Sequence, residues 1–335
     1  MIRARYIIDG VRQGPAPCEM LSSLGACGLE PSGEEIVDES LDPAPTSSEA
    51  GEAGIGDCLS AVRGFAGALP LPFAAFHAKS RFIAALLGYL RDGASLSPDQ
   101  LKAGLDISWP SPGKAPVGAM SAFYMAVSAL CEYMDALGAR LGYWCLSEGE
   151  PRIDVSFPGG DCALPSEAVE DPDSWIVYVP FETSDYRLGG SRLQMSAGIG
   201  ESVAPILSDP DYFSDCYELV REFVQDGVLV AAAVVGEGGL ARALDSFCRK
   251  SGASVKIADI RRANPRADAV HVLFAEVPGM LIQIKDADFD YIDAEFLLQD
   301  VLYYPLGHPG GDGLRIDTSS KSGIESILDS LASGR

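Results

Sequence analysis

Apolar residues along the chain follow two spacings, one typical of helices and one typical of buried strands. A spacing of three to four residues predicts helices over residues 77–91, 120–137, 211–225, 240–250, 268–276, 288–299 and 321–332. Short apolar runs predict strands over residues 3–11, 105–109 (after a helical turn from residue 101), 141–146, 152–157, 174–180, 228–235, 254–258, 280–285 and 301–306. Strands and helices alternate in the second half. This predicts an α+β fold, an α/β sandwich with helices packed on a face of one sheet.

Residues 228–250, VLVAAAVVGEGGLARALDSFCRK, are the stretch around which the chain is organised. Their apolar run predicts a strand buried on both faces, and the amphipathic segment that follows predicts a helix. A tight turn joins the two, formed by Gly236, Glu237, Gly238 and Gly239. Backbone N–H groups and the helix dipole converge at such a corner and can hold a phosphate. A close-packed corner without a ligand explains the glycines equally well.

Two further places are candidates for holding a phosphate or nucleotide. A second glycine turn offers the backbone N–H groups of Gly189, Gly190 and Ser191. His77 and Lys79 stand at the start of the helix predicted over residues 77–91. The alternative for His77 and Lys79 is a solvated helix start.

The charge of the chain limits its possible partners. A net charge of −23 argues against binding DNA or RNA through the general surface. Residues 31–56 are acidic, contain no Lys or Arg and are rich in Pro, Ser and Gly. They predict a solvated loop or linker, not a metal site. The densest positive cluster, Arg261, Arg262 and Arg266, is expected to be a solvated loop, with an anion site as the alternative.

Composition and cysteine spacing indicate a cytoplasmic globular protein. Apolar residues make up 47% and charged residues 22% of the chain. The eight cysteines form no C-x-x-C pair and there are three histidines, which gives a closed zinc site little support. The N-terminus lacks the apolar segment of a secretory signal, and no apolar run approaches the roughly 20 residues that span a bilayer. We therefore expect reduced thiols and no membrane association.

A polar, proline-rich passage at residues 158–172 predicts a boundary between two domains. The first domain is expected over residues 1–165 and the second over residues 170–335.

Five segments in the same order resemble motifs of one protein family. They are residues 105–109 for L-S-A-N-W, 121–138 for a helix ending in A-L-G-L, 188–191 for L-G-G-S, 233–240 for H-D-x-S-D-G-G-L and 276–284 for E-x-x-G-x-x-I-Q-V. In this order they resemble the AIR-synthase (PurM-like) superfamily, and within it the C-terminal half of phosphoribosylformylglycinamidine synthases, the PurL family. The resemblance covers residues 69–309.

The resemblance implies an architecture, a chemistry and partners. In the family, an N-terminal domain pairs with a second copy into a shared β-barrel, and a C-terminal α/β sandwich packs behind it. The family activates an amide or similar oxygen with ATP, which makes ATP or ADP and Mg²⁺ the implied cofactors. A homodimer, other synthase domains or subunits and a small phosphorylated ligand are the implied partners.

The departures from the family pattern fall at charged and metal-binding positions. Val234 stands where the family has its first Asp, and Glu237 where it has its second. Ser108 replaces an Asn, and the Lys and Asp of the family's G-K-D-S are absent near residues 144–147. A valine cannot bind Mg²⁺, which requires oxygen ligands. Glu237 is therefore expected to cap a helix rather than to bind metal.

These observations predict no catalytic residue and leave two functions open. The first is a phosphoribosylformylglycinamidine synthase-related protein of purine biosynthesis that lacks activity on its own. The second is a non-catalytic nucleotide-binding, phosphate-binding or scaffold protein with the AIR-synthase fold.

Overall fold

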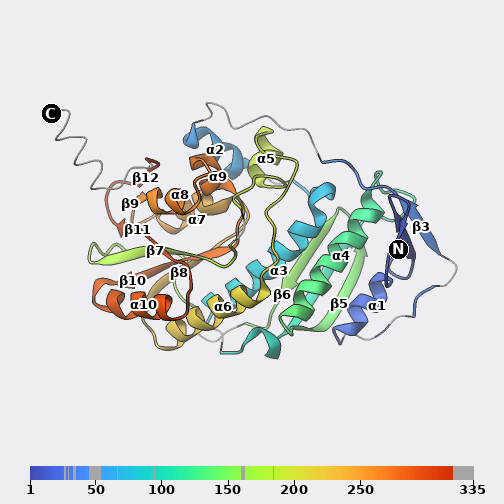
Figure 1. Cartoon of the computed structure of the whole chain (residues 1–335), viewed down its shortest axis with the longest axis horizontal. Coiled ribbons are helices and arrows are strands. Elements are labelled where there is room, and N and C mark those ends of the chain that lie inside the picture. Colours follow the sequence, from blue (N-terminus) through green and yellow to red (C-terminus); the bar gives the residue numbers. More distant parts are fainter. Residues whose placement is uncertain are drawn as a thin grey trace.

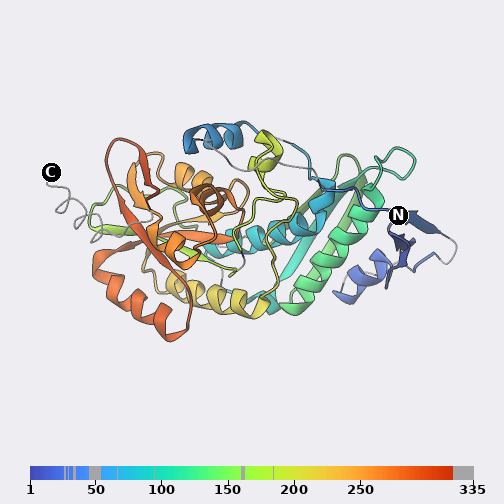
Figure 2. The same cartoon turned by 45° about the horizontal axis from the view of Figure 1, so that its top comes forward.

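The computed structural model describes residues 1–25, 28, 30–32, 35–44, 54–65, 67–93, 95–159, 163–183 and 185–319 (Figures 1 and 2). Its elements are β1 (Arg5–Ile8), β2 (Val11–Arg12), α1 (Pro17–Ser23), β3 (Ile36–Glu39), α2 (Ile55–Gly64), η1 (Leu71–Phe73), α3 (Ala74–Arg91), η2 (Pro98–Gln100), β4 (Lys102–Trp109), α4 (Ala119–Ala136), β5 (Arg140–Glu148), β6 (Arg152–Ser156), β7 (Ser174–Pro180), α5 (Arg192–Ala197), α6 (Pro210–Gln225), β8 (Leu229–Val235), α7 (Gly239–Phe247), β9 (Ala253–Lys256), α8 (Ala258–Ala263), α9 (Ala269–Phe274), β10 (Gly279–Lys285), α10 (Asp286–Leu298), β11 (Tyr304–Pro309) and β12 (Leu314–Asp317).

The first of the two main sheets has the strand order β5-β4-β6, with β4 parallel to β5 and antiparallel to β6. Alternate residues of β4 are buried in a cluster shared with α3 and α4, which lie side by side in Figure 1. The helical turn predicted from residue 101 is wrong, because η2 ends at Gln100 and Lys102 already pairs with Arg140. Pairing on both sides of this central strand outweighs the local preference of its sequence.

The second main sheet has the order β12-β9-β11-β7-β10-β8. Helices cover both of its faces, α6 and α10 on one and α7, α8 and α9 on the other (Figure 1). The prediction of helices packed on a face of one sheet was therefore incomplete. Strand β10 is buried from Gly279 to Ile284, because it lies between β7 and β8 and beneath both helical layers.

Strand β8, which precedes the glycine turn, is an edge strand. Its residues Val230, Ala233 and Val234 are only half-buried, so the prediction of a strand buried on both faces holds for part of it. The free edge is covered by α3 and by the segment around Pro165, whose carbonyl accepts a hydrogen bond from the N–H of Ala232 at 2.9 Å. This cover leaves no open ladder for another strand.

Several predictions for the second half of the chain differ from the structure. Residues 261 and 262 belong to the short helix α8 and not to a loop, so the strand predicted over 254–258 ends at Lys256. Strand β11 begins at Tyr304, because the N–H of Val301 still bonds the carbonyl of Phe296 at the end of α10. The parallel edge strand β12 carried no recognised sequence signal. The helix predicted over residues 321–332 lies outside the described residues.

Part of the acidic segment is ordered, which corrects the prediction of a loop over residues 31–56. Strand β3 pairs in parallel with β1, and helix α2 begins at Ile55. The carboxylate of Glu39 accepts hydrogen bonds from the N–H groups of Met120 at 2.8 Å and Ser121 at 2.9 Å. It therefore caps the first turn of α4, where unpaired N–H groups and the helix dipole favour a negative charge.

Helix α3 brings the two main sheets together. It packs against α4 and β6 on the side of the first sheet and against β8 and α6 on the side of the second. Its buried apolar stripe, predicted from the sequence, consists of Phe82, Ile83, Leu86, Leu87 and Leu90. The division into domains 1–165 and 170–335 and the barrel shared with a second copy remain predictions. In the described part of the chain, no helix has the length and apolar character to cross a membrane.

We expect Glu39→Ala to lower the free energy of unfolding by about 1–2 kcal/mol, because α4 loses the acceptor of two N–H groups. Urea unfolding measures this change. Asp38→Ala is the matched control, since Asp38 is a neighbouring exposed acidic residue of β3. Equal losses in the two variants would contradict a capping role.

Candidate ligand-binding cleft

A cleft of about 300 Å³ lies between α3, β6 and the glycine turn after β8. Among its lining residues are His77, Arg81, Asp154, Gly236, Glu237 and Glu276. Two adjoining hollows share Arg81 and Glu237 with it and extend the cleft towards Arg152 and Arg192. The predicted turn and the predicted start of α3 thus face one another across a single opening.

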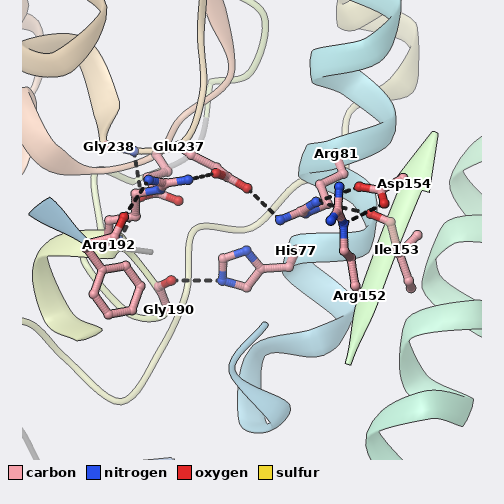
Figure 3. A network of polar contacts seen from close by, with 11 residues as sticks. His77, Arg81, Arg152, Ile153, Asp154, Gly190, Arg192, Glu237 and Gly238 are labelled. Carbon is pink, nitrogen blue, oxygen red and sulfur yellow. Dashed lines mark hydrogen bonds and ion pairs between the residues drawn. The ribbon is translucent and has the colours of Figure 1, made fainter. Parts of the chain in front are cut away.

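Five charged side chains form an alternating row across this opening (Figure 3). Glu237 pairs with Arg192 through one carboxylate oxygen and with Arg81 at 3.0 Å through the other. Arg81 also pairs with Asp154 at 3.0 Å, and Asp154 pairs with Arg152 at 2.5 Å. Three guanidinium groups therefore alternate with two carboxylates, which leaves an excess positive charge in an acidic protein.

The arginines determine the ionisation of Glu237. Burial alone would raise the pKa of this carboxyl, but Arg81 and Arg192 outweigh burial and hold the pKa below its usual value. Glu237 is therefore ionised near neutral pH, with one arginine on each oxygen. Its carboxylate links α3 and α5 to the turn, which is a different role from the predicted helix cap.

Glu276 lies beneath the glycine turn and is almost fully buried. One of its oxygens accepts the N–H groups of Gly238 and of Arg192, each at 2.7 Å. Burial raises the pKa of Glu276 to about 7 against the opposing effect of these two donors. The N–H of Gly239 donates to the carbonyl of Gly236 at 2.8 Å. The turn thus directs N–H groups of Gly238 and Gly239 at acceptors within the protein.

The second glycine turn is also satisfied internally. The N–H of Gly190 donates to the side chain of Gln194 at 2.7 Å, and the N–H of Ser191 to the carbonyl of Leu188 at 3.0 Å. The hydroxyl of Ser191 accepts the N–H of Gln194 and caps α5. A phosphate held by these N–H groups would have to displace bonds that already exist.

Close packing explains two of the glycines. At Gly189 an added Cβ would lie 2.1 Å from the carbonyl oxygen of Val203, and at Gly238 it would lie 2.8 Å from Val62 in a backbone with φ of +89°. No side chain fits either position without movement of the neighbouring residues. The packed-corner interpretation, left open by the sequence for residues 236–239, accounts for Gly238, and close packing also explains Gly189 in the second turn.

His77 faces the cleft and ties it to the second turn. Its Nε2 lies 2.8 Å from the carbonyl oxygen of Gly190, so Nε2 carries the proton and donates it. Burial lowers the pKa of His77 to about 4, against the opposing effect of this bond, and the ring is neutral at physiological pH. Lys79 lies elsewhere on α3, where its ammonium donates to the carbonyl of Leu207 at 2.9 Å.

The structure therefore places Gly236, Glu237 and His77 together and leaves Lys79 outside the cleft. Sequence reasoning missed the residues that supply most of the charge, Arg81, Arg152, Asp154, Arg192 and Glu276. Arg81 could have been recognised from the sequence, since it follows His77 by four residues and therefore lies on the same face of the helix. The others come from separate segments and carry no local pattern.

Several buried donors at this site have no partner among the described residues. They are the Nε of Arg81 and the Oγ of Ser80, and a terminal nitrogen of Arg242, which lies outside the lining of the cleft, is unpartnered as well. Burial, and next the neighbouring Arg192, lower the pKa of Arg242 against the opposing effect of nearby carboxylates. The donors suit phosphate oxygens. Mg²⁺ does not fit, because Glu237 already pairs with two arginines and, within the described ranges, no three His, Cys, Asp or Glu side chains group to hold an ion.

Comparison with known proteins relates this fold and sequence to one enzyme. The human phosphoribosylformylglycinamidine synthase is 28% identical over 141 residues, which are 41% of this chain and 10% of the human protein. T. maritima PurL complexed with FGAR superposes with a TM-score of 0.56 at 15% identity, over 78% of this chain and 42% of that one. By sequence the chain is related to phosphoribosylformylglycinamidine synthase, and its fold is similar to that of PurL.

Other comparisons agree on the fold of this PurL-related chain. The structure of PurLQS from Thermotoga maritima matches with a TM-score of 0.50 at 14% identity, over 71% of this chain and 39% of that one. No family model matches. The chain spans about a tenth of the length of the human relative, so the activity of the whole synthase does not transfer with the similarity.

We expect Glu276→Gln to gain stability relative to the wild type as pH rises. The unfolded carboxyl ionises near pH 4.5, whereas the folded one keeps its proton to about pH 7, so wild-type stability falls through this window. The variant lacks that loss, so its unfolding free energy should rise relative to that of the wild type by about 3 kcal/mol between pH 4.5 and pH 7. Urea unfolding at both pH values gives this difference.

The variant must be compared with the wild type at each pH, because the titration of His77 changes the stability of both proteins in the direction opposite to that of Glu276. Its folded pKa of about 4 lies below that of the unfolded chain, so its contribution to stability grows as pH rises from about 4 to 6.5. Glu170→Gln, at an exposed position, is the matched control. A pH-independent difference for Glu276→Gln would show that the buried carboxyl titrates normally.

Proposed function

We propose that this chain is a purine-biosynthesis protein that binds a phosphorylated ligand in the arginine-lined cleft and has no ATP-dependent activity of its own. The observation that supports this proposal is the pairing of Glu237 with both Arg81 and Arg192. The only carboxylate of the glycine turn is thereby neutralised by arginines. Phosphate oxygens are the ligands that such a row of guanidinium groups recognises.

The ligand would bind without a metal ion. Val234, at the family's first Asp position, is an uncharged residue near the end of β8 and two positions before the turn. Phosphoryl transfer from ATP needs Mg²⁺ to neutralise charge on the transferred phosphate, and Mg²⁺ needs oxygen ligands. Arg81, Arg152 and Arg192 supply positive charge directly, which serves binding but does not activate an amide.

The class of ligand is supported by the relatives. T. maritima PurL is described in complex with FGAR, and the cleft is lined by the turn after β8, which resembles the family's phosphate-binding segment. A cleft of about 300 Å³ with adjoining hollows accommodates a small phosphorylated molecule. A scaffold without a ligand is the second candidate, and the internal hydrogen bonds of both glycine turns favour it.

We expect the wild-type protein to bind formylglycinamide ribonucleotide and to release no ADP when ATP and Mg²⁺ are added. Arg152→Ala should weaken binding about tenfold, since one charge-assisted group is lost. Isothermal titration calorimetry measures the affinity, and a coupled assay measures ADP. Arg140→Ala is the control, because Arg140 pairs with Asp135 on the exposed surface.

The outcomes separate the two candidates. Ligand-dependent release of ADP would refute the loss of activity. Absence of any binding would refute the phosphorylated ligand and leave the scaffold. Equal affinities of the two arginine variants would place the ligand outside the cleft.

We further propose that the chain associates with a second copy, or with other synthase subunits, through the sheet β5-β4-β6. Strand β5 is an edge strand with exposed Tyr143 and Cys145, and unpaired strand edges favour pairing. Light scattering should give a mass above the 35.4 kDa of one chain at high concentration. A mass of one chain at every concentration would contradict self-association.

A further inference from the structure

A second cavity, of about 470 Å³, lies on the second main sheet's side of the molecule. Three separate segments enclose it: the chain between β7 and α5, the chain after α5, and the connection from α8 to α9. Its principal polar lining residues are Asp185, Arg187, Glu201, Asn264, Arg266 and His271. None of its lining residues lines the arginine-lined cleft, so the two sites are distinct.

Both carboxylates that line this cavity are already paired with cationic side chains. Asp185 pairs with Arg187 at 3.1 Å. Glu201 lies 2.6 Å from Nε2 of His271, whose Nδ1 lies 2.8 Å from Asp268. Because both ring nitrogens face carboxylates, both donate, and the ring is an imidazolium. Burial opposes this charge, but Asp268 and Glu201 outweigh it and raise the pKa of His271.

Arg266 is the cation of this lining that has no carboxylate partner. It is exposed at the cavity and forms no ion pair with any residue of the described chain. Arg187 bonds Asp185 through one nitrogen and keeps further N–H groups for a ligand. The buried ring of Tyr186 adds an apolar surface. Arg266 thus offers a guanidinium without a carboxylate partner in a cavity that has the room for one small anion, while Asp268 brings the total charge of the surrounding side chains to zero.

We propose that this cavity is a second binding site, for a small molecule that carries one carboxylate or phosphate group. Arg266 binds the oxyanion, Arg187 adds a second guanidinium, and a planar body lies against Tyr186. This assignment changes the expectation of a solvated loop for the cluster at residues 261–266. It does not rest on the function proposed for the cleft.

The three histidines provide a direct test, because each reports a different place. His271 lines the second cavity and His77 lines the cleft. His308 bonds the carbonyl of Ser174, at the opposite end of β7 from the cavity. NMR titration of labelled imidazole rings follows all three in one sample. Inorganic phosphate and acetate, added separately, distinguish phosphate from carboxylate recognition.

We expect at least one of the two anions to perturb His271 saturably and to move its titration midpoint to higher pH, because a bound anion favours the imidazolium. Arg266→Ala should weaken this binding about tenfold. Arg262→Ala is the matched control, since Arg262 pairs with Asp259 on α8 outside the cavity. An unchanged His308 signal shows that each variant is folded.

Two results would overturn the assignment. The first is no saturable change at His271 with either anion. The second is the same affinity in Arg266→Ala as in the wild type. A change at His77 alone would locate the anion in the cleft, which would support the function proposed there and refute the second site. Loss of the His77 response in Arg152→Ala, with the His271 response retained, would support two independent sites.

Discussion

The buried carboxylate of Glu276 is the contact on which the geometry of the cleft depends. It accepts N–H groups from Gly238 and Arg192 with one oxygen, and so joins the beginning of α7 to the beginning of α5. Both helices direct the positive ends of their dipoles at it. An anion-binding corner of this kind usually receives its negative charge from a ligand. Here the protein supplies a buried carboxyl of its own, which its pKa of about 7 keeps largely protonated below neutral pH, and which bonds the N–H groups of the corner without a ligand.

The second glycine turn is held from two sides by histidines. On one side Glu201 accepts the N–H of Leu188 at 2.7 Å and pairs with His271. On the other side His77 donates to the carbonyl of Gly190. One histidine is charged and exposed to the second cavity, and the other is neutral and faces the cleft. The backbone of the turn therefore connects the two sites, with a hydrogen bond to each side, and its glycines permit close packing.

The sequence predicted the backbone of this site better than its chemistry. Turns were recognisable because Gly236, Gly238 and Gly239 break an apolar run before an amphipathic helix, which is a local signal. The alternating row of charged side chains joins segments that are far apart in the chain, and no local sequence pattern indicates such contacts. Its members are Arg192, Glu237, Arg81, Asp154 and Arg152. Strand β3 was missed for the same reason, since pairing with β1 and the cap on α4 outweigh an acidic composition.

Charge, rather than shape, separates this cleft from a metal-dependent one. A carboxylate on the turn can hold a cation only if its oxygens are available, and both oxygens of Glu237 face guanidinium groups. Removing an arginine would free one oxygen of Glu237, but Val234, at the family's first Asp position, supplies no second carboxylate. Restoring metal binding would require an acidic residue at 234 together with the loss of an arginine partner of Glu237. A single substitution supplies only one of these two changes, so it leaves the arginine-rich arrangement unfit for a metal ion.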